Sequence, residues 1–80
     1  MTVNDAVAKR TVDLLRTHGI SQYRLERLSG IQHGSMQCIM HGINKTVTLS
    51  TVMMIARGFG MTADEFLNDE IFKSPNLEIE

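Results

Sequence analysis

The spacing of apolar residues predicts helices along almost the whole chain. Apolar residues recur at intervals of three and four, which is the repeat of one face of a helix, and no segment predicts a strand. Five segments carry this spacing: one from Val3 or Asp5 to Thr17, then residues 21–30, 32–41, 48–60 and 62–68. The sequence therefore predicts an all-α fold, a bundle of five helices.

Residues that commonly begin and end helices flank these segments. Ser21 and Thr48 are good N-cap residues because their hydroxyl groups can accept hydrogen bonds from the first free backbone N–H groups. Thr62 and Glu65 have the spacing of a capping box, which begins the last helix. Glycines stand where the first four helices are expected to end: Gly19, Gly30, Gly42 and Gly60.

The residues expected to be buried form one stripe on each helix. These stripes are aliphatic and rich in methionine, because the chain is 42% hydrophobic but only 5% aromatic. Eighty residues suffice for one domain with one such core. The expected core residues are Val7, Thr11, Leu14, Leu15 and His18 in the first helix, Met36, Ile39 and Met40 in the third, and Leu49, Val52, Ile55, Ala56 and Phe59 in the fourth.

Residues 21–42 predict two short helices joined by a tight turn. Gly30 ends the first of them, and Ile31 is expected to fill the corner between the two. In the second helix the inward stripe leaves a polar face uncovered. That face carries His33, Gly34, Gln37, Cys38 and His41. This layout is typical of a helix-turn-helix that reads DNA.

Three segments carry a resemblance to a known family: GISQYRLERLSGI, MHG and TLSTVMMIARGFGMTADEFL. Over residues 7–67 the chain resembles the Cro/repressor-type (xenobiotic-response-element-like) helix-turn-helix domain of phage and bacterial regulators. The matching positions are Ser21, Gln22, Leu25, Gly30, Ile39, Gly42, Ile55, Ala56 and Gly60. The resemblance implies a repressor-like bundle and a transcriptional regulator, a repressor that binds double-stranded operator DNA as a homodimer.

The resemblance also implies which residues contact DNA. Gln22 and Tyr23, at the start of the second helix of the bundle, are expected near backbone phosphates, and Ser35 is expected to contact a phosphate as well. His33 and Gln37 are expected to hydrogen-bond to base edges in the major groove. On the same face of that helix lie Gly34, Cys38 and His41. The alternative for these positions is an ordinary solvent-exposed side chain, and for Cys38 a half-buried thiol without a role.

Positive charge is concentrated in the part of the chain expected to meet DNA. Asn44, Lys45 and Thr46 resemble the loop with which the family grips the DNA backbone, although Lys45 can also be a plain exposed lysine. Residues 1–63 hold seven basic and three acidic side chains, whereas residues 64–80 hold one basic and six acidic ones. The net charge of -1 therefore conceals a basic body and an acidic C-terminal end.

Two positions depart from the family pattern. Glu26 stands where the family commonly has alanine, close to the helix that reads DNA, so its carboxylate is expected to bend outward toward Arg24 or Arg27. Val47 stands where many members have proline. Neither residue conflicts with the fold, but both put the detailed base contacts of the family in doubt for this chain.

Composition and spacing argue against catalysis and against a metal site. His33 and His41 are eight residues apart on one helix, so their directions differ by about 80°, and Cys38 is the one cysteine of the chain. We therefore expect no enzyme activity, no cofactor and no metal. One cysteine, no signal peptide and no long apolar run favour a cytoplasmic protein that is associated with the nucleoid when bound to DNA.

The C-terminal end is the expected place of a dimer interface. We expect residues 1–68 to form the DNA-binding domain and residues 69–80 to form an acidic extension of it. Phe66, Leu67, Ile71 and Phe72 supply apolar surface that one small core is not expected to bury completely, and such patches often mark interfaces. Alternatively, Ile71 and Phe72 fold back over the first helix and complete the monomer.

A protein-interaction module is the main alternative to a DNA-binding regulator. An antitoxin that neutralises a partner protein would keep the same core. The two functions differ in the outer face of the helix over residues 32–41, which is polar in a DNA reader and apolar in a protein-binding version. The mixed polar face of this chain favours DNA as the partner.

Overall fold

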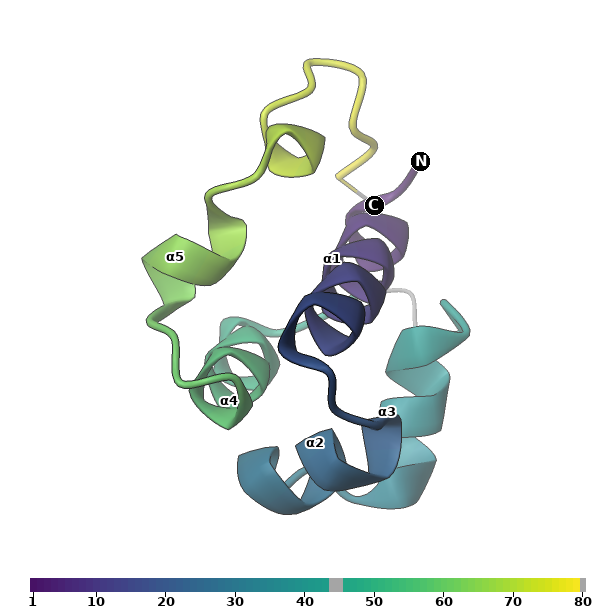
Figure 1. Cartoon of the computed structure of the whole chain (residues 1–80). Helices are drawn as coiled ribbons and strands as arrows, with labels where there is room; N and C mark the ends of the chain where they lie inside the picture. Colours follow the sequence, from purple (N-terminus) through teal and green to yellow (C-terminus); the bar gives the residue numbers. More distant parts are fainter. Residues whose placement is uncertain (44–45, 80) are drawn as a thin grey trace.

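The computed structural model describes residues 1–43 and 46–79 and shows a bundle of helices (Figure 1). Asn44, Lys45 and Glu80 lie outside the described residues, and the predictions made for Asn44 and Lys45 lie outside them too. The elements are α1 (Val3–His18), α2 (Gln22–Ser29), α3 (His33–Met40), α4 (Leu49–Gly58), α5 (Ala63–Leu67) and a short 3-10 helix, η1 (Glu70–Phe72). The all-α prediction with five helices is confirmed.

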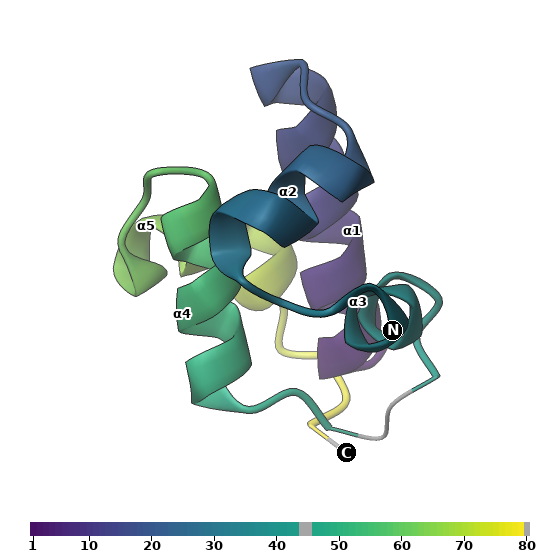
Figure 2. The same cartoon turned by 90° about the horizontal axis from the view of Figure 1, so that it is seen from below.

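Helix α1 lies at the centre of the bundle and the other elements pack around it (Figure 1). Helix α3 and the short η1 pack against α1, whereas α4 packs against both α2 and α5. Seen from below, α2 lies between α4 and α3, at the opposite end of the bundle from both chain termini (Figure 2). None of the described helices is long and apolar enough to cross a membrane.

The core is built from the stripes that the helical spacing predicts. Its largest fully buried side chains come from all five α-helices and include the polar Thr11, whose hydroxyl donates a hydrogen bond to the Val7 carbonyl at 2.7 Å. That bond satisfies a hydroxyl group that would otherwise be costly to bury. The buried apolar residues are Ala6, Val7, Leu14, Leu25, Ile31, Met36, Ile39, Val52, Ile55, Ala56, Phe59 and Phe66.

Two residues expected in the core lie at its edge instead. Leu49 is 65% exposed because it is the first residue of α4 and lies one turn before the buried Val52. His18 is exposed as the last residue of α1, although its ring lies 5.1 Å from that of Phe59. In both cases the residue continues the apolar face of its helix beyond the end of the core.

The predicted helix boundaries are satisfied by hydrogen bonds. The hydroxyl of Ser21 accepts from the N–H of Arg24 at 3.1 Å, and Thr48 caps α4 in the same manner. The capping box of Thr62 and Glu65 is present at the start of α5. A further capping box, which the sequence analysis did not identify, begins α1 with Thr2 as the N-cap residue.

The segment after α5 folds back as an arm over α1. Phe72 is half-buried, and its ring lies 6.0 Å from the ring of the fully buried Phe66. At the end of the arm, the N–H of Val3 donates to the Glu78 carbonyl at 2.9 Å. Phe66 is fully buried in this monomer, and Ile71 and Phe72 are half-buried. The dimer interface predicted for these residues and for the exposed Leu67 stays a prediction.

Arg10 fastens this arm to α1. Its guanidinium group donates to the carbonyl of Phe66 at 2.8 Å and to the carbonyl of Glu65 at 3.2 Å. It also pairs with the carboxylate of Asp69 at 3.3 Å, and its side chain is only 15% exposed. Since the last carbonyls of a helix have no partner within the helix, Arg10 supplies a donor for the Phe66 carbonyl near the end of the five-residue α5.

Helix α2 approaches α4 closely at Gly58, the last residue of α4. A Cβ atom at this position would lie 2.7 Å from Cδ1 of Leu25 and 3.2 Å from Cβ of Ser29. Leu25 is fully buried and has little room to move aside. The distance between these two helices therefore depends on the absence of a side chain at Gly58.

We expect Gly58→Ala to lower the free energy of unfolding by about 1–3 kcal/mol, because the added methyl group overpacks the contact with Leu25. The matched control is Gly34→Ala in α3, where a Cβ atom would meet nothing within 4 Å. That substitution should raise the free energy of unfolding by about 0.5–1 kcal/mol through helix propensity alone. Urea unfolding measures both. If Gly58→Ala changed the free energy of unfolding by the same amount and in the same direction as Gly34→Ala, α2 and α4 could move apart without cost.

Candidate nucleic-acid interface

The turn between α2 and α3 fixes the direction of α3. Gly30 adopts a left-handed conformation, with φ 78°, and its N–H donates to the Glu26 carbonyl at 3.0 Å. The next residue, Ile31, is buried at the corner between the two helices. Met36 and Ile39 then bury the inner face of α3, so its outer face is turned to solvent. This is the geometry of a helix-turn-helix.

The beginning of α3 is the most exposed part of this face. His33, Gly34 and Ser35 are exposed, and the His33 side chain is 69% accessible to solvent. Farther along the helix, His41 is exposed while Gln37 and Cys38 are half-buried. At the start of α2, Tyr23 is exposed and Gln22 is half-buried, and beyond α3 Thr46 is exposed.

Four side chains from α2 and α3 form one hydrogen-bonded network. The Gln22 amide nitrogen donates to Glu26 at 3.0 Å and to the Gln37 amide oxygen at 2.8 Å. The other end of the network is a contact of 2.8 Å between Nδ1 of His33 and the same oxygen of Glu26. The network joins the first helix of the helix-turn-helix to the second across their outer edge.

Glu26 does not bend outward, and the expectation that its carboxylate turns toward Arg24 or Arg27 is wrong. Its side chain is only 8% exposed and is directed to α3. Gln22 and His33 both hydrogen-bond to its carboxylate, which offsets the cost of removing the charge from water. The hydrogen bond from Gln22 is the main reason that the pKa of Glu26 is lowered, and His33 adds to this effect against the opposing effect of burial. Glu26 is therefore an ionised acceptor.

The network changes the roles open to two residues predicted to contact DNA. The Gln37 amide oxygen already accepts a hydrogen bond from Gln22, so in a bidentate pair with adenine it would have to accept a second one from N6. The Gln22 amide nitrogen is likewise directed to α3 and away from solvent. Sequence reasoning missed this arrangement because the carboxylate of Glu26 was placed on the wrong side of α2.

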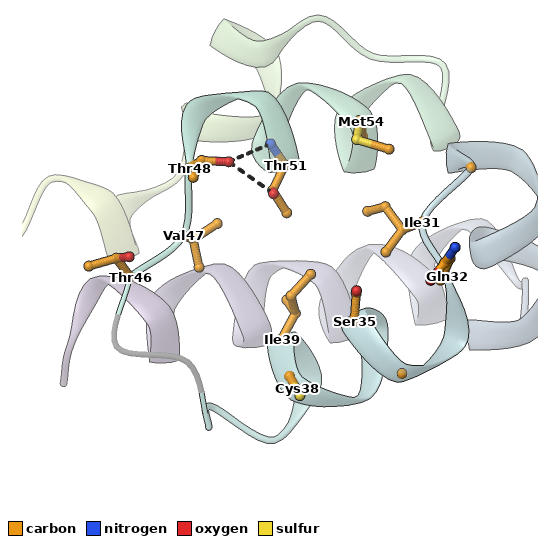
Figure 3. Close-up of a pocket in the computed structure, with 12 residues that line it drawn as sticks. Ile31, Gln32, Ser35, Cys38, Ile39, Thr46, Val47, Thr48, Thr51 and Met54 are labelled. Atoms are coloured by element: carbon orange, nitrogen blue, oxygen red, sulfur yellow. Dashed lines mark hydrogen bonds between the residues drawn. The ribbon is translucent and has the colours of Figure 1, made fainter.

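A groove of about 500 Å³ lies between α3 and the first turn of α4 (Figure 3). Cys38 and Ile39 line it from α3, and Val47 lines it from the segment that precedes α4. Four hydroxyl-bearing residues are among those that line the groove: Ser35, Thr46, Thr48 and Thr51. Thr48 and Thr51 were not among the predicted site residues. Their signal in the sequence was the N-cap position of Thr48, which places the first turn of α4 beside α3.

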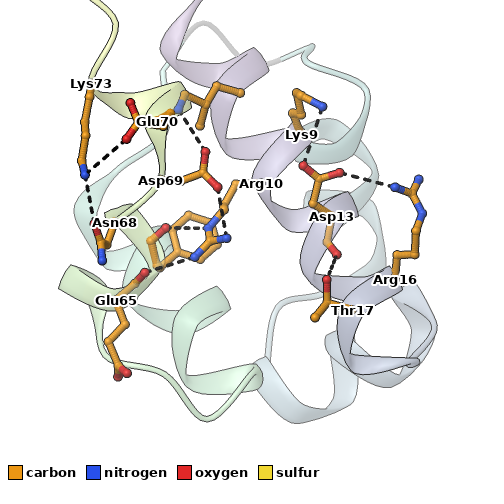
Figure 4. A network of polar contacts seen from close by, with 12 residues as sticks. Lys9, Arg10, Asp13, Arg16, Thr17, Glu65, Asn68, Asp69, Glu70 and Lys73 are labelled. Atoms are coloured by element: carbon orange, nitrogen blue, oxygen red, sulfur yellow. Dashed lines mark hydrogen bonds and ion pairs between the residues drawn. The ribbon is translucent and has the colours of Figure 1, made fainter.

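Part of the basic charge counted in the sequence is engaged in ion pairs within the fold. Arg10 holds the C-terminal arm, and Lys9 and Arg16 both lie 3.6 Å from the carboxylate of Asp13 (Figure 4). On α2, Arg24 and Arg27 are exposed, with the guanidinium group of Arg27 6.0 Å from the centre of the Tyr23 ring. Lys9 and Arg16 remain exposed in these pairs, so Arg10 is the paired base that the fold withdraws from solvent.

The described residues contain no group of three His, Cys, Asp or Glu side chains placed to hold a metal ion. His33 instead has Glu26 as its partner, and Cys38 is a free, half-buried thiol. The polar side chains of this face are thus arranged for hydrogen bonding.

Comparison with known families agrees with this geometry. Residues 13–70 match the Cro/C1-type HTH DNA-binding domain, and the match covers more than half of the chain. The chain belongs to the Cro/C1-type helix-turn-helix family. No curated protein and no solved structure matches the chain significantly. The resemblance stated from the sequence is confirmed.

The Cro/C1-type match begins within α1 and ends within η1. It therefore includes the whole helix-turn-helix, the groove beside α4 and the part of the arm that Arg10 holds. Because the family consists of DNA-binding domains, the match supports the assignment of this chain to the DNA-binding regulators.

The lowered pKa of Glu26 predicts a pH dependence of stability in this Cro/C1-type domain. A carboxyl group whose pKa is lower in the folded state stabilises the fold above its ordinary value of 4.5, and this effect is lost as the pH falls through the folded-state pKa. We expect Glu26→Gln to be less stable than the wild type at pH 7 and the difference to shrink below pH 4.5. Urea unfolding across this range measures it. A difference that does not change with pH would contradict a role for the carboxylate charge.

Proposed function

We propose that this chain is a transcriptional repressor of the bacterial or phage type that reads operator DNA with α3 in the major groove. The observation that carries the proposal is the polar, exposed start of α3, presented by a helix whose inner face is anchored by Met36 and Ile39. An α-helix fits the major groove of B-DNA, and the first residues of a recognition helix commonly contact base edges.

The side chains of α3 suit close contact with base edges. His33 projects into solvent and can hydrogen-bond to a base. Gly34 follows it, with open space where a side chain would be, so the backbone of α3 can approach the DNA closely. Cys38 lies on the next turn and offers a small apolar surface to a thymine methyl group, and His41 extends the same face.

The groove between α3 and α4 suits a phosphate of the DNA backbone. Its hydroxyl groups, including those of Ser35 and Thr46, are hydrogen-bond donors for phosphate oxygens. The N-terminus of α4 carries a partial positive charge and lies at the groove. In our proposal, Lys45 adds its charge next to Thr46, and Tyr23 and the backbone N–H of Gln22 at the start of α2 contact a phosphate on the other side of α3.

A protein-interaction function, such as that of an antitoxin, has less support. It requires an apolar outer face on α3, whereas His33, Ser35 and His41 make this face polar. Ile43 and Leu49 are large exposed apolar residues near the groove. Ile43 follows α3 and Leu49 begins α4, so neither lies on the outer face of α3.

Selection from a random pool of DNA duplexes tests the proposed function. We expect one sequence to be enriched, and binding to it to weaken steeply with salt. If a dimer contacts roughly four to eight phosphates, the slope of log K against log salt is about −4 to −7. His33→Ala should weaken binding to the selected sequence by about 1–3 kcal/mol, whereas Lys45→Ala should weaken binding to all sequences alike. Failure to enrich any sequence, together with affinity that does not change with salt, would reject DNA binding and favour the antitoxin.

We further propose that the chain acts as a homodimer, because two half-sites about one helical turn apart require two copies of α3 at a fixed distance. The surface we propose keeps Leu67 of α5 from the predicted interface and adds exposed apolar residues of α4. Leu49 and Met53 are four residues apart on α4 and therefore share a face, and both are exposed. Leu67 of α5, which packs on α4, is exposed as well.

Sedimentation at tens of micromolar tests the dimer. We expect the wild type to sediment as a dimer and Met53→Lys to sediment as a folded monomer with weaker operator binding, because the charge disrupts an apolar contact between subunits. Val12→Lys is the matched control, since Val12 of α1 is 38% exposed and Met53 is 40% exposed. The control should remain a dimer. A monomeric wild type, or a control as monomeric as the variant, would contradict the proposed interface.

A further inference from the structure

We propose that Glu26 determines which base His33 prefers, by holding the imidazole proton on Nδ1 and leaving Nε2 as a hydrogen-bond acceptor toward the DNA. This inference rests on the proposed function and specifies the chemistry of its most exposed reader. The base facing His33 is then one that presents an amino group in the major groove, which is adenine through N6 or cytosine through N4. Guanine, which presents only acceptors there, is disfavoured.

The position of the proton follows from the contact between Glu26 and His33. The distance of 2.8 Å between Nδ1 and the carboxylate oxygen is that of a hydrogen bond, and one of the two atoms must supply the proton. Glu26 is ionised and can only accept, so Nδ1 is the donor. A neutral imidazole carries one N–H, and its second nitrogen, Nε2, is therefore a bare acceptor.

The carboxylate is itself held in place by the rest of the network. The oxygen that accepts from His33 also accepts from the Gln22 amide nitrogen at 3.0 Å. That nitrogen is in turn held by the amide oxygen of Gln37 at 2.8 Å. Glu26 is 8% exposed, so water has little access with which to replace His33 as its partner. The ring of His33 is thus oriented from inside the protein while its side chain is 69% exposed.

A different charge state of His33 would have the opposite effect on the base. A protonated imidazolium donates from both nitrogens, so Nε2–H would favour N7 and O6 of guanine. A histidine without the carboxylate can adopt either tautomer and can accept from one base or donate to another. The base at this position therefore reports the state of the ring, and Glu26 is a positioning residue that acts through His33.

The first test is the tautomer itself, measured without DNA. Nitrogen-15 spectra of the imidazole rings at a pH of about 8, above the ordinary histidine pKa, distinguish the two tautomers from each other and from the imidazolium. We expect His33 to carry its proton on Nδ1 in the wild type and to lose this preference in Glu26→Gln. His41, which is exposed on the same side of α3, serves as the control within each spectrum. A proton on Nε2 of His33, or an imidazolium, in the wild type overturns the proposal.

The second test uses the DNA duplex obtained by selection with the wild type. The base pair that His33 contacts is identified as the one whose sequence preference is lost in the variant His33→Ala. Each of the four possible base pairs is then placed at that position of the duplex. We expect adenine or cytosine to bind about 5- to 100-fold more tightly than guanine. In Glu26→Gln this ratio should fall to about twofold or less, while preferences at other positions are kept. Glu70→Gln, a substitution of the same kind at a side chain that is 93% exposed, should keep the ratio.

Glu26→Asp is the second variant, in case Glu26→Gln does not fold. It keeps the charge but withdraws the carboxylate by one methylene group, so it should also lose the tautomer and the base preference. If the wild type prefers guanine at this position, the role of Glu26 is overturned while the proposed function stands. The same holds if the ratio of affinities for adenine or cytosine over guanine is unchanged in a folded Glu26 variant. If no sequence is enriched at all, both the proposed function and this inference fail.

Discussion

The placement of α3 depends on how closely α2 can approach α4. That distance is short because Gly58 leaves space for Leu25, whose Cδ1 atom would lie 2.7 Å from any Cβ at residue 58. Leu25 belongs to the helix that leads, through the turn at Gly30, directly into α3. A change in the contact at Gly58 would therefore move the turn and the outer face of α3 together. The contact is remote from DNA in our proposal, yet the presentation of the recognition helix depends on it.

The network around Glu26 adds a second, polar constraint on the same two helices. A core contact such as that of Leu25 sets a distance but leaves a side chain on the surface free to rotate. The hydrogen bonds of Glu26 to Gln22 and His33 restrict that rotation at the place where we expect bases to be read. An alanine at residue 26 could not form them. The departure from the family pattern at this position is therefore a difference in chemistry and not only in size.

The parts of the fold that depend on neighbours in sequence could be predicted, and those that join distant residues could not. The caps at Ser21 and Thr48 and the buried stripe of α3 follow from local spacing, as does the exposed start of α3 with His33. The role of Gly58 could not be predicted because its constraint comes from Leu25, 33 positions earlier in the sequence. The inward turn of Glu26 depends on His33 across the turn, and the groove depends on where α4 begins relative to α3. Neither contact leaves a pattern in the sequence, although the N-cap residue Thr48 indicates where α4 begins.

The hydrogen bonds of Arg10 to residues around the end of α5 have a consequence for the order in which the chain can fold. The hydrogen bond to the Phe66 carbonyl joins residues 56 positions apart, and the N–H of Val3 bonds to the still later Glu78. The first half of α1 therefore acquires these partners only when nearly the whole chain has been synthesised. Contacts over such separations form slowly, because the intervening chain must first be brought together. The helix-turn-helix, by contrast, is made of segments that follow one another directly and can form early. We therefore expect the arm to close over α1 after the helix-turn-helix has formed.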